Sequence, residues 1–240
     1  MSSLMTYIKE SHACRSHYSS GPAIVELARD FTPWRRSQKP GRSPLNDALP
    51  WITFPAIRFL QSRLTPQAVV FEYGSGGSTI FCARRAKHVY SIEHDASWWQ
   101  LVTQRMAALN LHNWTGELIA TDPVDDRLGP SADPSDPLAY GSGSTCDFDV
   151  NRTFRNYVRA IDRHADASLD VILIDGRARP ACFLHALPKL RPGGCILWDN
   201  TDRSYYHPAM KLGANLDFLD FPGPAPYTSF FTRTTAFLRR

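Results

Sequence analysis

The chain has 240 residues and a formal net charge of +4, with 43% hydrophobic and 21% charged residues. This hydrophobic content excludes a disordered chain, and the length suits one sizeable α/β domain with an extension. The modest charge disfavours a nucleic-acid-binding surface, because the basic residues are scattered apart from short pairs such as Arg35-Arg36 and Arg239-Arg240.

The sequence shows no sign of export or membrane insertion. No apolar stretch reaches 18 residues, and residues 1–30 contain no apolar run typical of a signal peptide. The cysteines form no Cys-x-x-Cys pair and leave one thiol unpaired in any disulfide scheme; they are Cys14, Cys82, Cys146, Cys182 and Cys195. We therefore expect a soluble, cytoplasmic protein in a reducing compartment, with no membrane partner.

Residues 1–50 are expected to form an N-terminal extension, and residues 51–240 one domain. A helix is predicted through residues 23–28, whereas prolines interrupt regular structure at Pro40, Pro44 and Pro50. Apolar residues then recur at helical spacing over residues 51–64 and predict an amphipathic helix. In this segment Trp51 and Phe54 could roof a cavity, although packing in the core is the favoured role of such residues.

The segment Val69–Thr79 contains a buried strand that breaks into a glycine-rich turn and opens a helix. Glycines at 74, 76 and 77 allow a tight bend that presents backbone N–H groups, and a helix start favours a polar or anionic ligand. Glu72 stands at the end of the strand, where it would repel a pyrophosphate but could accept hydrogen bonds from an ammonium group. An amino-acid-bearing cofactor is therefore favoured over a dinucleotide.

A second strand is predicted over residues 88–92, and Glu93 ends it 21 positions after Glu72. In nucleotide-binding βαβ units, an acid at about this distance accepts from the ribose hydroxyls. The dinucleotide fingerprint requires a glycine where this chain has Thr79, which disfavours a nicotinamide dehydrogenase. His94, beside Glu93, is expected to be a hydrogen-bonding partner rather than a catalyst.

The middle of the chain alternates helices and strands around a long irregular segment. Helices are predicted over residues 97–109 and 154–161, the first capped by Asp95 or Ser97, with a short strand over residues 118–120. Residues 123–150, rich in Pro, Gly, Ser and Asp, are expected to be an insertion, because ordinary connections are shorter. A lid and a disordered excursion remain equal alternatives for it.

Four further strands are predicted in the second half of the chain. They cover residues 169–175, the region 190–200 with its Pro-Gly-Gly turn, residues 216–221 and residues 229–238. A helix over residues 181–190 precedes the second of these strands. The last two strands are separated by a proline-rich loop at residues 222–227 and are expected to form a hairpin.

This ordered series of motifs resembles the class I S-adenosylmethionine-dependent methyltransferases over roughly residues 50–240. The resemblance implies an α/β, Rossmann-like, doubly wound sheet of seven mostly parallel strands with an antiparallel C-terminal hairpin, plus the N-terminal extension. It also implies S-adenosylmethionine as cofactor, with Glu72 and the glycine turn at its methionine part and Glu93 at its ribose. The expected cofactor-binding residues are Glu72, Gly74, Ser75, Gly76, Ser78, Thr79, Glu93, His94 and Asp175.

Asp175, Asp199 and Asn200 end neighbouring predicted strands, which places three oxygen donors at one edge of a parallel sheet. Such donors suit Mg²⁺ or another divalent cation, and the arrangement resembles the metal site of catechol and caffeoyl-coenzyme A O-methyltransferases. The alternative is that Asp175 caps a helix and Asp199-Asn200 forms a turn.

The catechol and caffeoyl-coenzyme A O-methyltransferases carry a lysine after the first aspartate. Here Arg177 and Arg179 follow Asp175 instead, and arginine is a poor base. Both arginines suit a substrate carboxylate or phosphate.

The resemblance predicts methyl transfer to a small-molecule acceptor, with O-methylation ahead of N-methylation. The expected catalytic residues are Asp175, Arg177 and His207, the last as a base in the loop after the fifth strand. Methylation of RNA or protein and a non-catalytic binding module with this fold are the alternatives. We expect no nucleic-acid partner, and the oligomeric state stays open, a homo-oligomer included.

Overall fold

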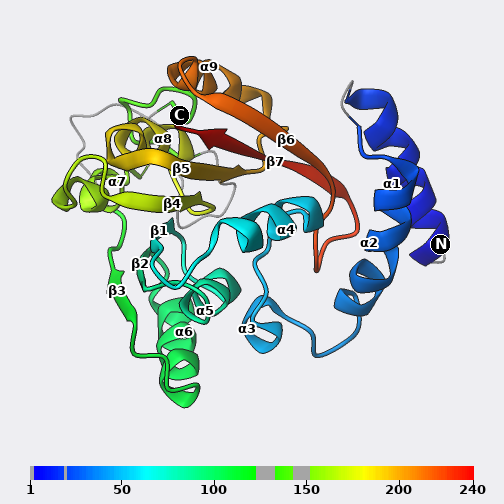
Figure 1. Ribbon diagram of the computed structural model, residues 1–240, viewed down its shortest axis with the longest axis horizontal. Coiled ribbons are helices and arrows are strands. Elements are labelled where there is room, and N and C mark those ends of the chain that lie inside the picture. The colour runs from blue at the N-terminus through cyan, green and yellow to red at the C-terminus, as the bar shows by residue number, and fades with distance from the viewer. Residues whose placement is uncertain (1–2, 19–20, 123–132, 143–151) are drawn as a thin grey trace.

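A seven-stranded sheet runs through the middle of the molecule, with helices on both faces (Figure 1). The computed structural model describes residues 3–18, 21–122, 133–142 and 152–240. The strand order is β3-β2-β1-β4-β5-β7-β6, and β7 runs antiparallel to the other six strands. The expected doubly wound sheet with a C-terminal hairpin is therefore confirmed. The strands are β1 (Val69–Tyr73), β2 (His88–Glu93), β3 (Trp114–Leu118), β4 (Leu169–Ile174), β5 (Leu190–Asp199), β6 (Asp217–Pro224) and β7 (Phe231–Leu238).

Each face of the sheet is buried under its own set of helices, which explains why the central strands are apolar at nearly every position. One core cluster joins alternate strand residues such as Val70 and Leu197 to α4 (Phe54–Arg63), α5 (Gly77–Ala83) and α6 (Ala96–Ala108). The other cluster joins residues such as Phe71 and Ile196 to helical segments from the second half of the chain. These are α7 (Arg155–Arg159), η1 (Ala160–Arg163), α8 (Arg179–Ala186), η2 (Leu187–Lys189), η3 (Ser204–Tyr206) and α9 (His207–Met210). The short η4 (Lys211–Gly213) follows α9.

The N-terminal region contains more helix than the sequence indicated. Where one helix over residues 23–28 was predicted, the structure has α1 (Ser3–His17), α2 (Ile24–Ser37) and the short α3 (Pro44–Asp47). Figure 1 shows α1 and α2 beside the β6–β7 end of the sheet. An aromatic cluster joins them to it, because the Tyr7 ring lies 4.9–5.0 Å from the rings of Phe31, Trp34 and Phe231.

Two strand predictions were wrong in their boundaries. The third strand is β3, upstream of the predicted residues 118–120, because Trp114 pairs with β2 and packs its ring 5.3 Å from that of Trp99. β6 continues through Pro222 and Pro224, which were expected in a loop. An edge strand tolerates proline because the ring can occupy a position that needs no ladder N–H.

The insertion predicted at residues 123–150 lies largely outside the described residues, so its alternatives stay predictions. Within it, residues 133–142 are described as turns, with the Tyr140 hydroxyl 3.4 Å from His185 Nε2. None of the helices in the described part of the chain is both long and apolar enough to cross a bilayer.

We expect Gly77→Ala to destabilise the fold by about 1–3 kcal/mol, the usual cost of overpacking. A Cβ at this first residue of α5 would overlap the rigid backbone carbonyl oxygens of Pro44 and Leu49. Urea unfolding would measure the loss. Gly76→Ala is the matched control, since its Cβ would meet the Trp98 ring at an ordinary 3.5 Å. Equal stability of the two variants would contradict this account of the turn.

Candidate active site

A cavity of about 540 Å³ opens at the carboxyl ends of β1, β4 and β5. The strand order reverses there, since the chain continues from β1 to β2 on one side and from β4 to β5 on the other. Ligands of open α/β sheets bind at such a reversal. The wall also includes residues from α3 and the loop that follows it, from the loop after β5 and from the β6–β7 hairpin: Pro44, Trp51, Asp202, Arg203, Ala225, Thr228, Phe230 and Thr232.

The glycine-rich turn forms one end of this cavity. Gly74 adopts a φ of 93°, which favours glycine, and its N–H donates to the Ile92 carbonyl at 2.9 Å. Ser75, Gly76 and Ser78 lie in the wall, as expected. Trp98 also lines it and donates from Nε1 to the Ser75 carbonyl at 2.7 Å. The turn is therefore fixed on both sides while its outer surface faces the cavity.

Glu72 and Thr79 lie beneath the turn rather than in the cavity wall. Both side chains are fully buried, and Thr79 Oγ1 donates to Glu72 Oε1 while accepting from the Gly76 N–H at 2.8 Å. Glu72 Oε2 is buried with no hydrogen-bond partner in the part of the chain described. Burial raises the pKa of Glu72 to about 8, although the Thr79 hydroxyl opposes the rise. A direct contact of Glu72 or Thr79 with a cofactor therefore stays a prediction. In the structure these two side chains support the glycine-rich turn from beneath.

Glu93 lines the cavity and is already rich in hydrogen bonds. One oxygen accepts from the Ser75 N–H at 3.0 Å and hydroxyl at 3.2 Å, and the other from the N–H groups of His94 and Asp95 at 2.8 and 3.1 Å. Burial would raise the pKa of Glu93, but the hydrogen bonds from His94 and Asp95 outweigh it and hold the pKa below its ordinary value. A ribose hydroxyl would have to replace the rotatable Ser75 hydroxyl to bind this carboxylate.

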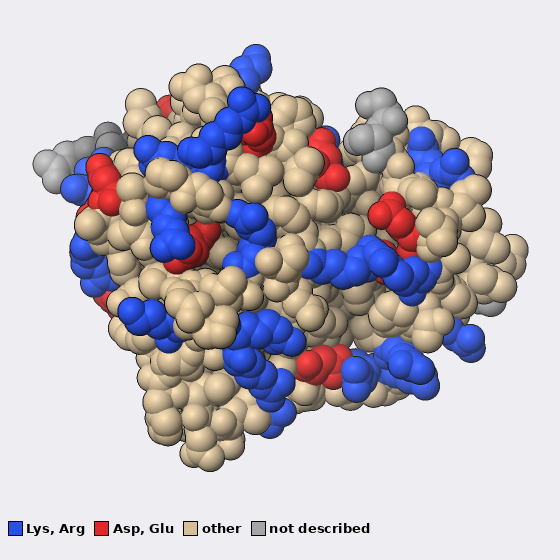
Figure 2. Space-filling view, viewed as in Figure 1, with Lys and Arg blue, Asp and Glu red and all other residues tan. Residues whose placement is uncertain are grey.

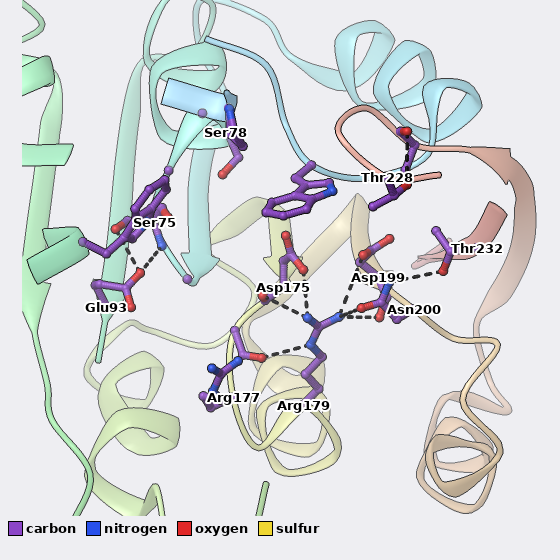
Figure 3. A pocket seen from close by; sticks show the side chains of 18 of the residues that line it. Ser75, Ser78, Glu93, Asp175, Arg177, Arg179, Asp199, Asn200, Thr228 and Thr232 are labelled. Atoms are coloured by element: carbon purple, nitrogen blue, oxygen red, sulfur yellow. Dashed lines mark hydrogen bonds and ion pairs between the residues drawn. The ribbon is translucent and has the colours of Figure 1, made fainter. Parts of the chain in front are cut away.

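The opposite end of the cavity is organised by Arg179, as Figure 3 shows. Nε donates to the Gly176 carbonyl at 3.0 Å, and Nη2 donates to the Asp175 carbonyl and to Asp175 Oδ1 at 3.1 and 2.9 Å. Nη1 donates to the Asp199 carbonyl at 2.7 Å and to Asn200 Oδ1 at 3.1 Å. These contacts match the five N–H groups of a guanidinium. The prediction that Arg179 grips a substrate anion is therefore wrong, because its donors are already used.

Asp175 and Asp199 end neighbouring strands but have different surroundings. The Asp175 side chain is 36% exposed in the cavity, whereas that of Asp199 is 4% exposed and accepts from Thr234 Oγ1 at 2.5 Å. Burial, together with the charge of Asp175, raises the pKa of Asp199 to about 7. Burial likewise raises the pKa of Asp175, although Arg179 opposes it. Asp175 is thus the carboxylate that a ligand can reach.

The three predicted metal ligands do not fit a divalent ion. The Arg179 guanidinium lies 2.9 Å from Asp175 Oδ1, 3.1 Å from Asn200 Oδ1 and 4.0 Å from Asp199 Oδ2, so a cation already stands among them. Asn200 in addition donates from Nδ2 to Thr232 Oγ1 at 3.2 Å. The described residues contain no other group of three acidic, histidine or cysteine side chains suited to a metal. The proposed magnesium site is therefore not supported.

The structure separates the other two expected catalytic residues. Arg177 lines the cavity, but the exposed His207 does not. The Nε2 atom of His207 lies 3.2 Å from the Thr201 carbonyl and 3.4 Å from Arg233 Nη2.

Of the two aromatic residues that could roof the cavity, Trp51 is in the wall and 47% exposed, whereas Phe54 is buried in the core. Sequence reasoning missed the wall residues from the late loops, since no local pattern marks them.

No family model matches the sequence, and no curated protein matches it. Two solved structures share the fold over nearly the whole chain. The O-methyltransferase TomG of Streptomyces achromogenes, involved in tomaymycin synthesis and solved with S-adenosylmethionine, is 15% identical, with 98% of this chain and 90% of that chain covered and a TM-score of 0.52. A candidate O-methyltransferase from Klebsiella pneumoniae is 16% identical, with 99% of both chains covered and a TM-score of 0.51. At these identities the likeness establishes the fold.

We expect Glu72→Gln to change how the free energy of unfolding depends on pH. The pKa of Glu72 is raised from 4.5 to about 8, so its contribution to stability is full below pH 4.5 and is lost as the pH rises towards 8. From about pH 5 to pH 8 the wild type should therefore lose several kcal/mol relative to Glu72→Gln, since one pKa unit corresponds to about 1.4 kcal/mol. Urea unfolding at a series of pH values measures the difference.

Glu93→Gln is the control for this titration. The pKa of Glu93 is held below its ordinary value, so its contribution is lost only as the pH falls into the acid range. Its difference from the wild type should stay constant between about pH 5 and pH 8. The same constancy for Glu72→Gln would show that Glu72 does not titrate in this range.

Proposed function

We propose that this chain, which has the class I S-adenosylmethionine-dependent methyltransferase fold, transfers the methyl group of S-adenosylmethionine to a hydroxyl group of a small molecule. One observation carries the proposal. A single cavity joins the glycine-rich turn and Glu93 at one end to the exposed carboxylate of Asp175 at the other. The first end suits a cofactor, and the second suits an acceptor that must lose a proton.

The residues at the first end fit the cofactor. Ser75, Gly76 and Ser78 present the turn to the cavity, and Glu93 and His94 lie beside them at the end of β2. Glu93 holds ribose hydroxyls by exchanging its bond with the Ser75 hydroxyl. When bound, S-adenosylmethionine supplies a methyl group on a positively charged sulfur. We propose that Asp175, which also lines the cavity, faces the amino-acid part of the cofactor and the acceptor.

The acceptor's orientation and deprotonation fall to Asp175. Methyl transfer is an in-line displacement, so the protein mainly aligns the nucleophile and provides a site for its proton. The Asp175 carboxylate is fixed on one side by Arg179 and remains 36% exposed to the cavity, where it can accept from a hydroxyl. This favours O-methylation over N-methylation, because a neutral amine needs no base before it attacks.

The size and lining of the cavity favour a small acceptor. A volume of about 540 Å³ is in the range of small-ligand pockets, and Trp51 and Phe230 supply exposed aromatic surface in its wall. Arg177 and Arg203 supply positive charge beside Asp175. An acceptor that combines a ring or short carbon skeleton with a hydroxyl matches this lining.

Methylation of RNA is the less favoured candidate. On the face shown in Figure 2, Lys and Arg lie among Asp and Glu rather than forming one uninterrupted basic surface. Several arginines are paired with carboxylates, which reduces their availability to phosphates; these pairs are Arg42–Asp47, Arg58–Asp30, Arg191–Asp170 and Arg240–Asp217. A non-catalytic binding module is also disfavoured, because the turn, Glu93 and Asp175 all line the same cavity.

We expect the wild type to bind S-adenosylmethionine and S-adenosylhomocysteine, and Glu93→Gln to bind about 10-fold to 100-fold more weakly, the cost of losing a charged hydrogen-bond acceptor. Isothermal titration calorimetry measures both. Glu117→Gln is the control, because this exposed β3 acid pairs with Arg163 and does not line the cavity. A folded wild type that binds neither compound would refute the cofactor assignment, and unchanged affinity in Glu93→Gln would refute the role of Glu93.

We expect Asp175→Asn to lower kcat by about 10²-fold or more, the usual contribution of a general base, with a much smaller change in S-adenosylhomocysteine affinity. The assay follows tritium from methyl-labelled S-adenosylmethionine into small phenols, catechols and hydroxy acids, with bulk tRNA and rRNA as separate acceptors. Asp170→Asn is the control, at the opposite end of β4. Transfer to RNA alone would favour the second candidate, and binding without any transfer would favour the binding module.

A further inference from the structure

A buried guanidinium fills the space that a metal ion would need at the acceptor end of the cavity. The Arg179 side chain is 8% exposed and contacts Asp175 Oδ1 at 2.9 Å and Asn200 Oδ1 at 3.1 Å, with Asp199 Oδ2 at 4.0 Å. In Figure 3 the guanidinium points into the gap between the ends of β4 and β5, with these three side chains around it. The oxygens that made the sequence look like a metal site therefore already surround a cation.

Arg179 is held there by the backbone as well as by the acids. Three of its five hydrogen bonds go to the carbonyl groups of Asp175, Gly176 and Asp199, which belong to the turns that end β4 and β5. Moving the side chain aside would leave these carbonyl acceptors without their donor, at a cost of about 1–3 kcal/mol for each one that stays buried. The binding free energy of a divalent ion would therefore have to exceed the free-energy cost of displacing Arg179 from these hydrogen bonds.

A divalent ion also could not bind beside Arg179. It would need the same oxygens of Asp175 and Asn200, at less than the distance that the guanidinium now keeps from them. Two cations would then share one largely buried space, where like-charge repulsion is stronger than in water. The guanidinium and the metal are therefore alternatives at this site.

We infer that Arg179 is the permanent cation of this site, that it holds Asp175 in position for the acceptor, and that the site works without a divalent metal. The inference rests on the proposed function only where it assigns Asp175 a part in methyl transfer. Arg179 is a positioning residue, because its donors are all used and it stays protonated, so it neither binds the acceptor nor removes its proton.

The test is a titration with manganese chloride, with free Mn²⁺ followed by electron paramagnetic resonance. We expect no saturable binding to the wild type below about 1 mM. Arg179→Ala removes the cation and leaves the oxygens of Asp175, Asp199 and Asn200, so it should bind Mn²⁺ at least about tenfold more tightly than the wild type. The double variant Arg179→Ala with Asp175→Asn should lose this gain, and Arg179→Lys should show none because an ammonium group replaces the guanidinium.

Arg177→Ala is the matched control, since it removes a neighbouring cavity-lining arginine whose side chain points away from Asp199 and Asn200 in Figure 3. It should gain no Mn²⁺ binding. A positioning role further predicts that Arg179→Lys recovers part of the kcat that Arg179→Ala loses, with a smaller effect on KM, and that EDTA leaves wild-type transfer unchanged. Thermal unfolding establishes which variants fold.

One bound Mn²⁺ per wild-type chain, lost in Asp175→Asn, would overturn the inference whether or not the Arg179 variants fold. A folded Arg179→Ala that gains no Mn²⁺ binding, or a gain of equal size in Arg177→Ala, would also contradict it. These outcomes are distinct from a failure of the proposed function. A wild type that binds no S-adenosylhomocysteine would refute the cofactor while the manganese titration still decides the metal question.

Discussion

The hydrogen bonds of one buried guanidinium hold the ends of β4 and β5 together, and the end of the cavity that contains Asp175 depends on them. The end that contains the glycine-rich turn is built differently, because Glu93 is held mainly by backbone N–H groups. This difference appears in the electrostatics: the pKa of Glu93 is lowered, whereas burial raises the pKa of Asp199 to about 7. The pKa values of these two carboxyl groups are therefore shifted in opposite directions.

The backbone of the glycine-rich turn lies close to the backbone that follows β4, and this contact fixes how far the turn lies from Asp175. A Cβ at Gly74 would lie 3.1–3.3 Å from the backbone of Asp175 and Gly176, so the turn after β1 touches the turn after β4. A Cβ at Gly176 would in turn overlap the buried Tyr157 hydroxyl. Gly74, which allows the sharp turn after β1, thus also allows the backbone of Asp175 to lie close to that turn. A larger residue at either position would separate the turn from the carboxylate.

Local chemistry in the sequence was enough to predict the frame of the molecule. The apolar runs of β1, β2, β4 and β5, the glycine-rich turn and the Asp95 cap of α6 depend on residues a few positions apart, and all are present. The order of these elements predicted the sheet and its reversal point, and so the edge where the cavity lies. It also placed Glu93, Asp175 and the exposed face of the turn in the wall of that cavity.

What the sequence could not determine depends on contacts between distant segments. The β6–β7 loop reaches the cavity because Trp34 Nε1 and Gln38 Nε2 donate to the Thr228 carbonyl, 194 and 190 positions away, and Tyr227 bonds to Asp47. Likewise, Arg179 looked like a ligand for an anion, and Asp175, Asp199 and Asn200 like ligands for a metal. The sequence by itself determined which charged residues stand at the strand ends. Only the tertiary structure decided that they bind one another, because side-chain direction and hydrogen-bond pairing are set by packing rather than by local sequence.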